Sequence, residues 1–61
     1  MYIIKDWAGN VYDFRGKFML PQFAVALEFD DIDAANEFIE VNFDDETLED
    51  IFVESFGYPE D

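Results

Sequence analysis

The 61-residue sequence contains no cysteine and no histidine. Disulfides are therefore excluded, and so are the ligands on which structural zinc sites depend. A serine or cysteine nucleophile activated by histidine cannot be assembled either. Paired carboxylates can catalyse hydrolysis, but they need a cleft that places them in different environments, and so short a chain has little room for one. We expect a protein that is not an enzyme and uses no cofactor.

Long hydrophobic runs are also missing. No segment approaches the roughly 20 apolar residues that cross a bilayer, so we expect no membrane partner. The N-terminus lacks the basic region and apolar run of a signal peptide. The absence of cysteine fits a reducing compartment. These features together predict a cytoplasmic protein, or one that acts in the cytoplasm of a host cell.

Basic residues are scarce and confined to the first half of the chain. The chain contains three Lys and Arg residues and sixteen Asp and Glu residues, which gives a net charge of −13. Residues 1–27 contain three bases and two acids, whereas residues 28–61 contain 14 acids and no base. Direct binding of nucleic acid is disfavoured, because contacts to phosphate require Lys and Arg. We also expect the crowded carboxylates to repel one another, so that mild acidification stabilises the fold.

Two short acidic clusters invite comparison with calcium loops. They contain Asp30, Asp31 and Asp33, and Asp44, Asp45 and Glu46. An EF-hand loop that began at Asp31 would need a ligand where Ala35 stands and a glycine where Asn36 stands. The motif fails, so we expect no metal site. A helix start and a solvated loop explain the clusters better.

What the sequence does have is apolar and aromatic residues, which make up 51% and 20% of the chain. They suffice for one small core, so residues 1–61 are expected to form a single acidic domain. The hydrophobic period is two over residues 23–29, which predicts a strand. After Asp30 the period becomes helical, with Asp30 or Asp31 as the N-cap. Asn42 is expected to end this helix in a left-handed conformation.

The remaining segments complete an α+β domain. Residues 2–6, 11–14 and 51–56 are predicted strands, 44–50 a loop with at most one helical turn, and 57–61 a frayed tail. Residues 18–25 stay open between a strand and a short helix that begins at Pro21. The predicted order is β-β-β-α-β, a mainly antiparallel sheet of about four strands with one amphipathic helix on one face. The predicted core joins Ile32, Ala35, Phe38 and Ile39 of the helix to Phe23, Val25, Leu27 and Val53.

Three segments carry a resemblance to known proteins. YIIKDWAGN at residues 2–10, EFDDIDAANEFI at 28–39 and IFVESF at 51–56 resemble a group of small, acidic, mostly uncharacterised proteins of tailed bacteriophages. Residues 18–25 look like an insertion relative to that pattern. The resemblance implies a phage accessory protein and no catalytic residues. Small acidic phage proteins often look like inhibitors of host nucleic-acid enzymes.

The acidic half admits two interpretations. It can be a solvated face that keeps an aromatic-rich chain soluble, or a surface that binds a basic protein. The helical spacing of Asp33, Glu37 and Glu40 places them on one exposed stripe. The predicted partner-binding residues are Asp33, Glu37, Glu40, Asp44, Asp45, Glu46, Glu49 and Asp50. Acids just after a helix C-terminus oppose its dipole, which solubility alone does not explain.

The favoured hypothesis is a nucleic-acid mimic. A row of carboxylates can occupy the basic channel in which an enzyme holds DNA or RNA, and so act as a stoichiometric inhibitor. The natural targets of such an anti-defence protein are a CRISPR effector, a restriction enzyme or a DNA-repair glycosylase. The alternative is a non-enzymatic structural module, possible as a homodimer, that self-associates through the aromatic residues Trp7, Tyr12, Phe14 and Tyr58.

Overall fold

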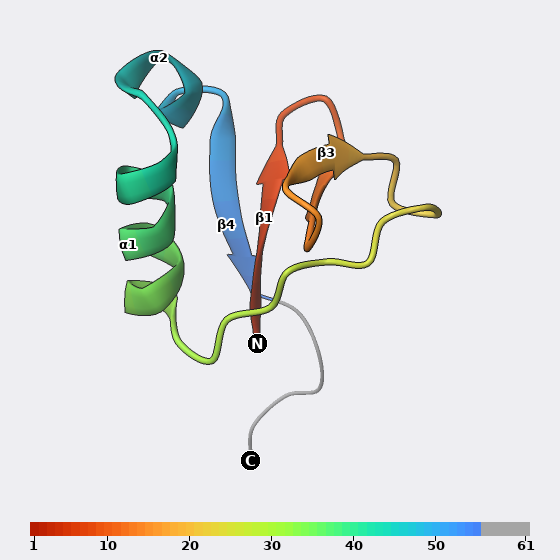
Figure 1. Cartoon of the computed structure of the whole chain (residues 1–61), viewed down its shortest axis with the longest axis horizontal. Helices are drawn as coiled ribbons and strands as arrows, with labels where there is room; N and C mark the ends of the chain where they lie inside the picture. The colour runs from red at the N-terminus through yellow and green to blue at the C-terminus, as the bar shows by residue number, and fades with distance from the viewer. Residues whose placement is uncertain (56–61) are drawn as a thin grey trace.

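The computed structural model describes residues 1–55, which form a four-stranded antiparallel sheet and two helices (Figure 1). The elements are β1 (Tyr2–Asp6), β2 (Val11–Asp13), β3 (Lys17–Met19), α1 (Ile32–Asn42), α2 (Asp45–Leu48) and β4 (Ile51–Ser55). The strand order is β3-β2-β1-β4, and α1 packs against β1 and β4. The predicted α+β order is confirmed, with α2 as the single helical turn expected in residues 44–50. Phe56 and the expected tail at 57–61 lie outside the described residues.

The first hairpin is built around the carboxylate of Asp6. Its oxygens accept hydrogen bonds from the backbone N–H groups of Ala8 (3.0 Å) and Asn10 (2.8 Å) and from the Asn10 side-chain amide (3.1 Å). Gly9 has φ +95°, a conformation that glycine adopts without steric penalty. Gly9 and the carboxylate of Asp6 therefore stabilise the turn that joins β1 to β2.

Strand β1 pairs along its whole length with β4. The register runs from Tyr2 opposite Ser55 to Asp6 opposite Ile51. Lys5 Nζ lies 2.9 Å from Glu54 Oε1 across this pair. Because β4 is the last strand in sequence and β1 the first, the sheet brings the two ends of the described chain together.

The third strand is not where the sequence predicted it. Residues 17–19 form β3 and pair with β2, whereas residues 23–29, the expected strand, form only isolated bridges. Residues 21–23 are a turn, in which Leu20 O accepts from the N–H groups of Phe23 (2.9 Å) and Ala24 (3.0 Å). Pro21 therefore opens a turn, and neither the predicted strand nor the alternative short helix forms there. A tight turn at Gly16 folds residues 17–19 back onto one edge of β2, and residues 23–29 form isolated bridges with β2 and β1 elsewhere.

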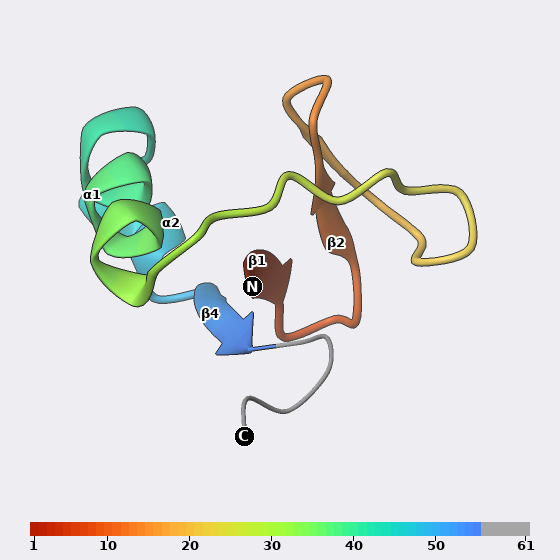
Figure 2. The same cartoon turned by 90° about the horizontal axis from the view of Figure 1, so that it is seen from below.

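Residues 24–29, which we call the strap, instead fill a wedge between two diverging strands. Strands β1 and β2 share only the pair Lys5–Val11. Beyond it the strap takes the place of β1: Leu27 N–H donates to Tyr12 O (3.1 Å), and Phe29 and Tyr2 exchange two backbone hydrogen bonds (2.8 and 2.9 Å). Figure 2 shows this segment crossing beside β2 on its way to α1. The strap is thus extended backbone bonded at both ends, which explains its strand-like sequence.

The core centres on Ile4, Tyr12 and Ile51. Tyr12 makes edge-on contacts with the rings of Phe18, Phe38 and Phe43, at centroid distances of 5.1, 5.8 and 5.3 Å. Such aromatic pairs contribute about 0.5–1.5 kcal/mol beyond the area they bury. The partly buried side chains around this centre are Phe18, Leu27, Phe29, Phe38, Ile39, Phe43 and Leu48.

The predicted core was wrong at three residues. Ala35 is fully buried, and Phe38, Ile39 and Leu27 pack against the centre as expected. Ile32, Phe23 and Val25 are instead exposed. Ile32 begins α1 before the helix reaches the sheet, and the turn at residues 21–23 carries the other two away from it.

Helix α1 also ends differently from the prediction. Asn42 is the last helical residue, and its side-chain amide donates to Phe38 O (2.9 Å). Phe43 closes the helix in an extended conformation, with its N–H bonded to Ile39 O. In the described part of the chain only Gly9 and Gly16 have positive φ, so the predicted left-handed Asn42 does not occur.

Candidate partner-binding surface

Helix α1 presents acids on the side opposite its buried face. The spacing of Ala35, Phe38 and Ile39 directs these side chains to the sheet, and Asp33, Glu37 and Glu40 fall on the opposite side of a helix with 3.6 residues per turn. All three acids are exposed. Neighbours three or four residues apart have Cβ atoms about 5–6 Å from each other, which makes a continuous negative stripe. The predicted stripe is therefore present.

The remaining predicted residues lie in and beside α2, the next element along the chain. Asp44, Asp45 and Glu46 surround its start, and Glu49 and Asp50 form the turn into β4. All five are exposed. The backbone oxygen of Asp50 accepts from Trp7 N–H (3.2 Å), which ties this turn to the end of β1. We call the eight predicted residues the acidic surface; α1 and α2, which carry or adjoin them, lie on the same side of the sheet (Figure 1).

Two aspartates have local structural roles. Asp31 Oδ1 accepts from Ala34 N–H (2.7 Å) and caps α1, and Asp44 Oδ1 accepts from Thr47 N–H (2.9 Å) and caps α2. Of the two predicted caps for α1, Asp31 is the one used. Asp45 and Glu46 occupy the first turn of α2, where the helix dipole favours negative charge. The acids after α1 therefore start a second helix, which offsets the unfavourable dipole interaction expected from the sequence.

The pKa of Asp44 is lowered by its hydrogen bonds to Thr47, first of all from the backbone N–H. Within the acidic half this is the opposite of the direction expected from charge repulsion. The cap stabilises the charged form more than the neighbouring acids disfavour it. Asp44 therefore caps α2 and is also exposed on the surface.

The bases lie elsewhere and two of them are neutralised. Among residues 1–55, ion pairs join Lys5 to Glu54 and Arg15 to Asp13. None of the eight residues of the acidic surface takes part in either pair. The surface is therefore an uncompensated negative patch, which attracts positive partners and repels polyanions. Within the same residues, no three acidic side chains converge as a metal-binding group, and no helix is long and apolar enough to cross a membrane.

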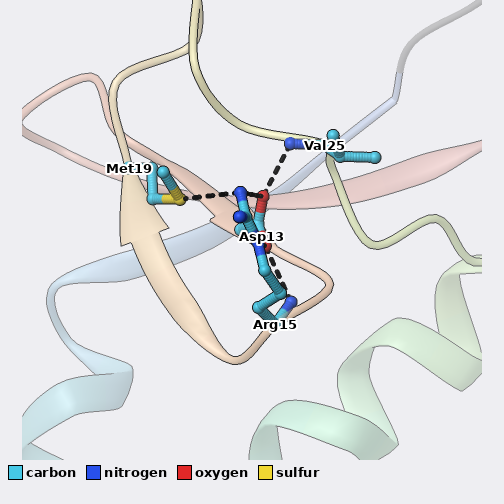
Figure 3. Close-up of polar contacts among 4 residues, drawn as sticks. All are labelled: Asp13, Arg15, Met19 and Val25. Atoms are coloured by element: carbon cyan, nitrogen blue, oxygen red, sulfur yellow. Dashed lines mark hydrogen bonds and ion pairs between the residues drawn. The ribbon is translucent and has the colours of Figure 1, made fainter.

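Asp13, the residue whose pKa is shifted most strongly, was not among the residues predicted from the sequence. Its side chain is fully buried and accepts from Arg15 N–H (2.7 Å), Arg15 Nε (2.7 Å), Arg15 Nη2 (3.1 Å) and Val25 N–H (2.7 Å) (Figure 3). The Arg15 side-chain hydrogen bond, with the backbone N–H groups, holds the pKa of Asp13 far below its usual range. Every contact is to the protein itself, so the residue organises the fold and offers nothing to a substrate.

A signal for this role exists in the sequence. Asp13 begins the turn Asp-Phe-Arg-Gly, and aspartate is favoured at the first position of such turns because its carboxylate accepts from the backbone two residues on. What the sequence cannot show is the bond to Val25, twelve residues away. That contact depends on where the strap runs.

Comparison of the sequence with protein-family models, and of the chain with curated proteins and solved structures, finds no match.

Proposed function

We propose that this chain is a small acidic phage-type accessory protein that binds a host nucleic-acid enzyme and inhibits it by nucleic-acid mimicry. The acidic surface occupies the basic channel of the enzyme in place of DNA or RNA. One observation carries the proposal: eight exposed carboxylates in and beside α1 and α2, none of them paired with a base within the described residues. The phage context rests on the resemblance of residues 2–10, 28–39 and 51–56.

The role is stoichiometric binding and not catalysis. The chain has no histidine or cysteine, and among residues 1–55 the one buried carboxylate, Asp13, accepts hydrogen bonds from the protein itself. A surface of exposed carboxylates can still bind strongly to a field of Lys and Arg, because opposite potentials speed association and select the partner. Solubility does not require so much charge, since a net charge of about 2–8 suffices for a small domain.

The test is charge reversal on α1. The parent protein is assayed for inhibition of DNA cleavage by a purified CRISPR effector, a restriction endonuclease and a DNA glycosylase. Glu37→Lys combined with Glu40→Lys should abolish inhibition of the enzyme that the parent inhibits. Lysine is a good helix former and both positions are exposed, so the melting temperature should change little.

The matched control carries the same change in charge at Glu28 and Asp30, which are exposed but lie before α1. It should retain most of the inhibition. Inhibition by the parent should also weaken as salt rises and as competing DNA is added. Equal loss in both double variants would mean that net charge alone matters, and full inhibition by Glu37→Lys/Glu40→Lys would end the mimicry proposal.

A further inference from the structure

A second surface lies at the end of the molecule away from α1. Four large apolar side chains are exposed there, by 57% for Phe14, 51% for Leu20, 62% for Phe23 and 59% for Val25. We call these four residues the apolar loop. In both views the chain that follows β3 projects to the side of the sheet opposite the helices (Figures 1 and 2). Groups of exposed apolar side chains often mark interaction sites on soluble proteins.

The apolar loop is held in place and is not a frayed segment. Phe14 N–H donates to Val25 O (2.9 Å), which joins its two sides. Asp13 clamps both sides at once, through Arg15 and through Val25 N–H (Figure 3). The turn at Leu20 is closed by two further backbone bonds. The fold thus uses a buried charge to present apolar side chains to solvent, which points to an interaction surface.

The charge around the apolar loop identifies its partner. Residues 14–27 contain two bases and no acid, in a chain of net charge −13. Arg15 is neutralised by Asp13 and lies over the Phe14 ring, 5.5 Å from its centroid, so Lys17 is the main remaining charge. This is the part of the described surface where two copies of the chain can meet without bringing their carboxylates together.

Other occupants fit less well. The basic channel proposed as the target of the acidic surface would bring many Lys and Arg against Lys17, whereas a second copy brings one Lys17 and an Arg15 that is already paired with Asp13. A contact between the apolar loop of one copy and the acidic helix of the next is head-to-tail, and such contacts propagate into rings or filaments. Two loops meeting about a two-fold axis bury like surfaces and close the assembly.

We propose that the apolar loop is the docking site for a second copy of this chain, loop against loop, in a dimer that leaves both acidic surfaces exposed. The dimer does not depend on the inhibitory function proposed above, and the mimicry test does not depend on the dimer. Salt separates the two interactions. Screening weakens attraction between the acidic surface and a basic enzyme, but it strengthens association between two copies of like net charge.

Sedimentation equilibrium of the parent chain at increasing concentration and at low and high salt tests the dimer. We expect a reversible monomer–dimer equilibrium that shifts towards dimer as salt rises. Phe23→Ser should raise the dissociation constant about tenfold or more, as for an aromatic anchor of an interface. Val41→Ser is the matched control, because Val41 is 76% exposed but lies on α1. It should leave the dissociation constant unchanged.

Disulfide trapping provides a second variant that keeps all four apolar side chains. The chain has no cysteine, so Gln22→Cys, beside the turn at Leu20, introduces a single thiol at an exposed position. Under mild oxidation it should form a covalent dimer far faster than Glu37→Cys on α1. Two results would overturn the proposal: a parent chain that stays monomeric at all concentrations and salts, or equal trapping of the two cysteine variants. A third would do the same: Phe23→Ser loses enzyme inhibition although the parent forms no dimer. The last result would assign the apolar loop to the enzyme instead.

Discussion

At the scale of single residues, Asp13 does more for this fold than any acid of the exposed stripe. It is fully buried, and its four donors come from two segments that are distant in sequence. A buried carboxylate without such donors would be strongly destabilising, and with them it fixes the β2–β3 hairpin against the strap. The lowered pKa values of Asp13 and Asp44 therefore arise from hydrogen bonds that hold the fold together.

Replacing Asp13 with asparagine should destabilise the protein and flatten its response to acid. The amide keeps the shape but loses the charge, and its NH2 group opposes a donor of Arg15 or Val25. Because the folded-state pKa of Asp13 lies below the unfolded value near 3.8, its contribution is complete above about pH 5 and is lost progressively as pH falls below 3.8. Thermal melts followed by circular dichroism from neutral to strongly acidic pH measure both effects.

The control for this prediction is Asp45→Asn, at an exposed position. It should change the free energy of unfolding by no more than about 0.5 kcal/mol. A parent protein that gains stability on acidification below pH 4, or an Asp13→Asn variant with the parent's acid sensitivity, would show that the clamp is not the dominant titrating contact.

At the scale of elements, the junctions are set by short polar side chains. Asp6 closes the first hairpin, Asp31 starts α1 and Asp44 starts α2. Each satisfies backbone N–H groups that the neighbouring element leaves without a partner. Of these three residues only Asp44 belongs to the acidic surface, whereas Asp33, Glu37 and Glu40 lie at exposed positions of α1 that cap no helix.

Asp31→Ala should destabilise the protein by about 0.5–2 kcal/mol, because it removes the acceptor for Ala34 N–H at the start of α1. Chemical denaturation gives the free energy of unfolding. Asp30→Ala is the adjacent control: it removes the same charge, and Asp30 is exposed, so a much smaller effect is expected. Equal effects would assign the loss to helix-dipole electrostatics and not to the cap bond.

At the scale of the whole molecule, the protein is polarised. Acids gather over α1 and α2 at one side, and the apolar loop with Arg15 and Lys17 lies at the other (Figure 1). The first side suits a basic partner and the second suits a second copy. A dimer built this way would present two acidic surfaces pointing away from each other, so that binding to an enzyme would not compete with assembly.

The melting temperature of the parent should rise with salt, because screening relieves repulsion within the acidic half. Most of the rise is expected by an ionic strength of about 0.1 M, where the Debye length is about 10 Å. The measurement is made at low protein concentration, so that dimer formation does not contribute. Glu37→Gln combined with Glu40→Gln should melt higher than the parent in low salt and respond less to added salt. A melting temperature independent of salt in both proteins would mean that the acids are too well solvated to affect stability.

The sequence by itself determined the elements whose signals are local. The strand predicted at residues 2–6, the described part of the strand predicted at 51–56, the helical period after Asp30 and the exposed acidic stripe all appear in the structure. Each depends on neighbours within a few residues, through side-chain period, turn geometry or capping. The α+β class follows from these elements alone.

Tertiary structure decided where residues 17–29 go, because alternation over residues 23–29 states that the segment is extended but not what it pairs with. The turn at Gly16 places residues 17–19 along one edge of β2. On the other edge β1 diverges from β2, and the strap fills the gap between them. Those contacts removed Phe23 and Val25 from the core and buried Tyr12 and Asp13. No local period encodes that arrangement, since it depends on which distant segment lies along each edge of β2.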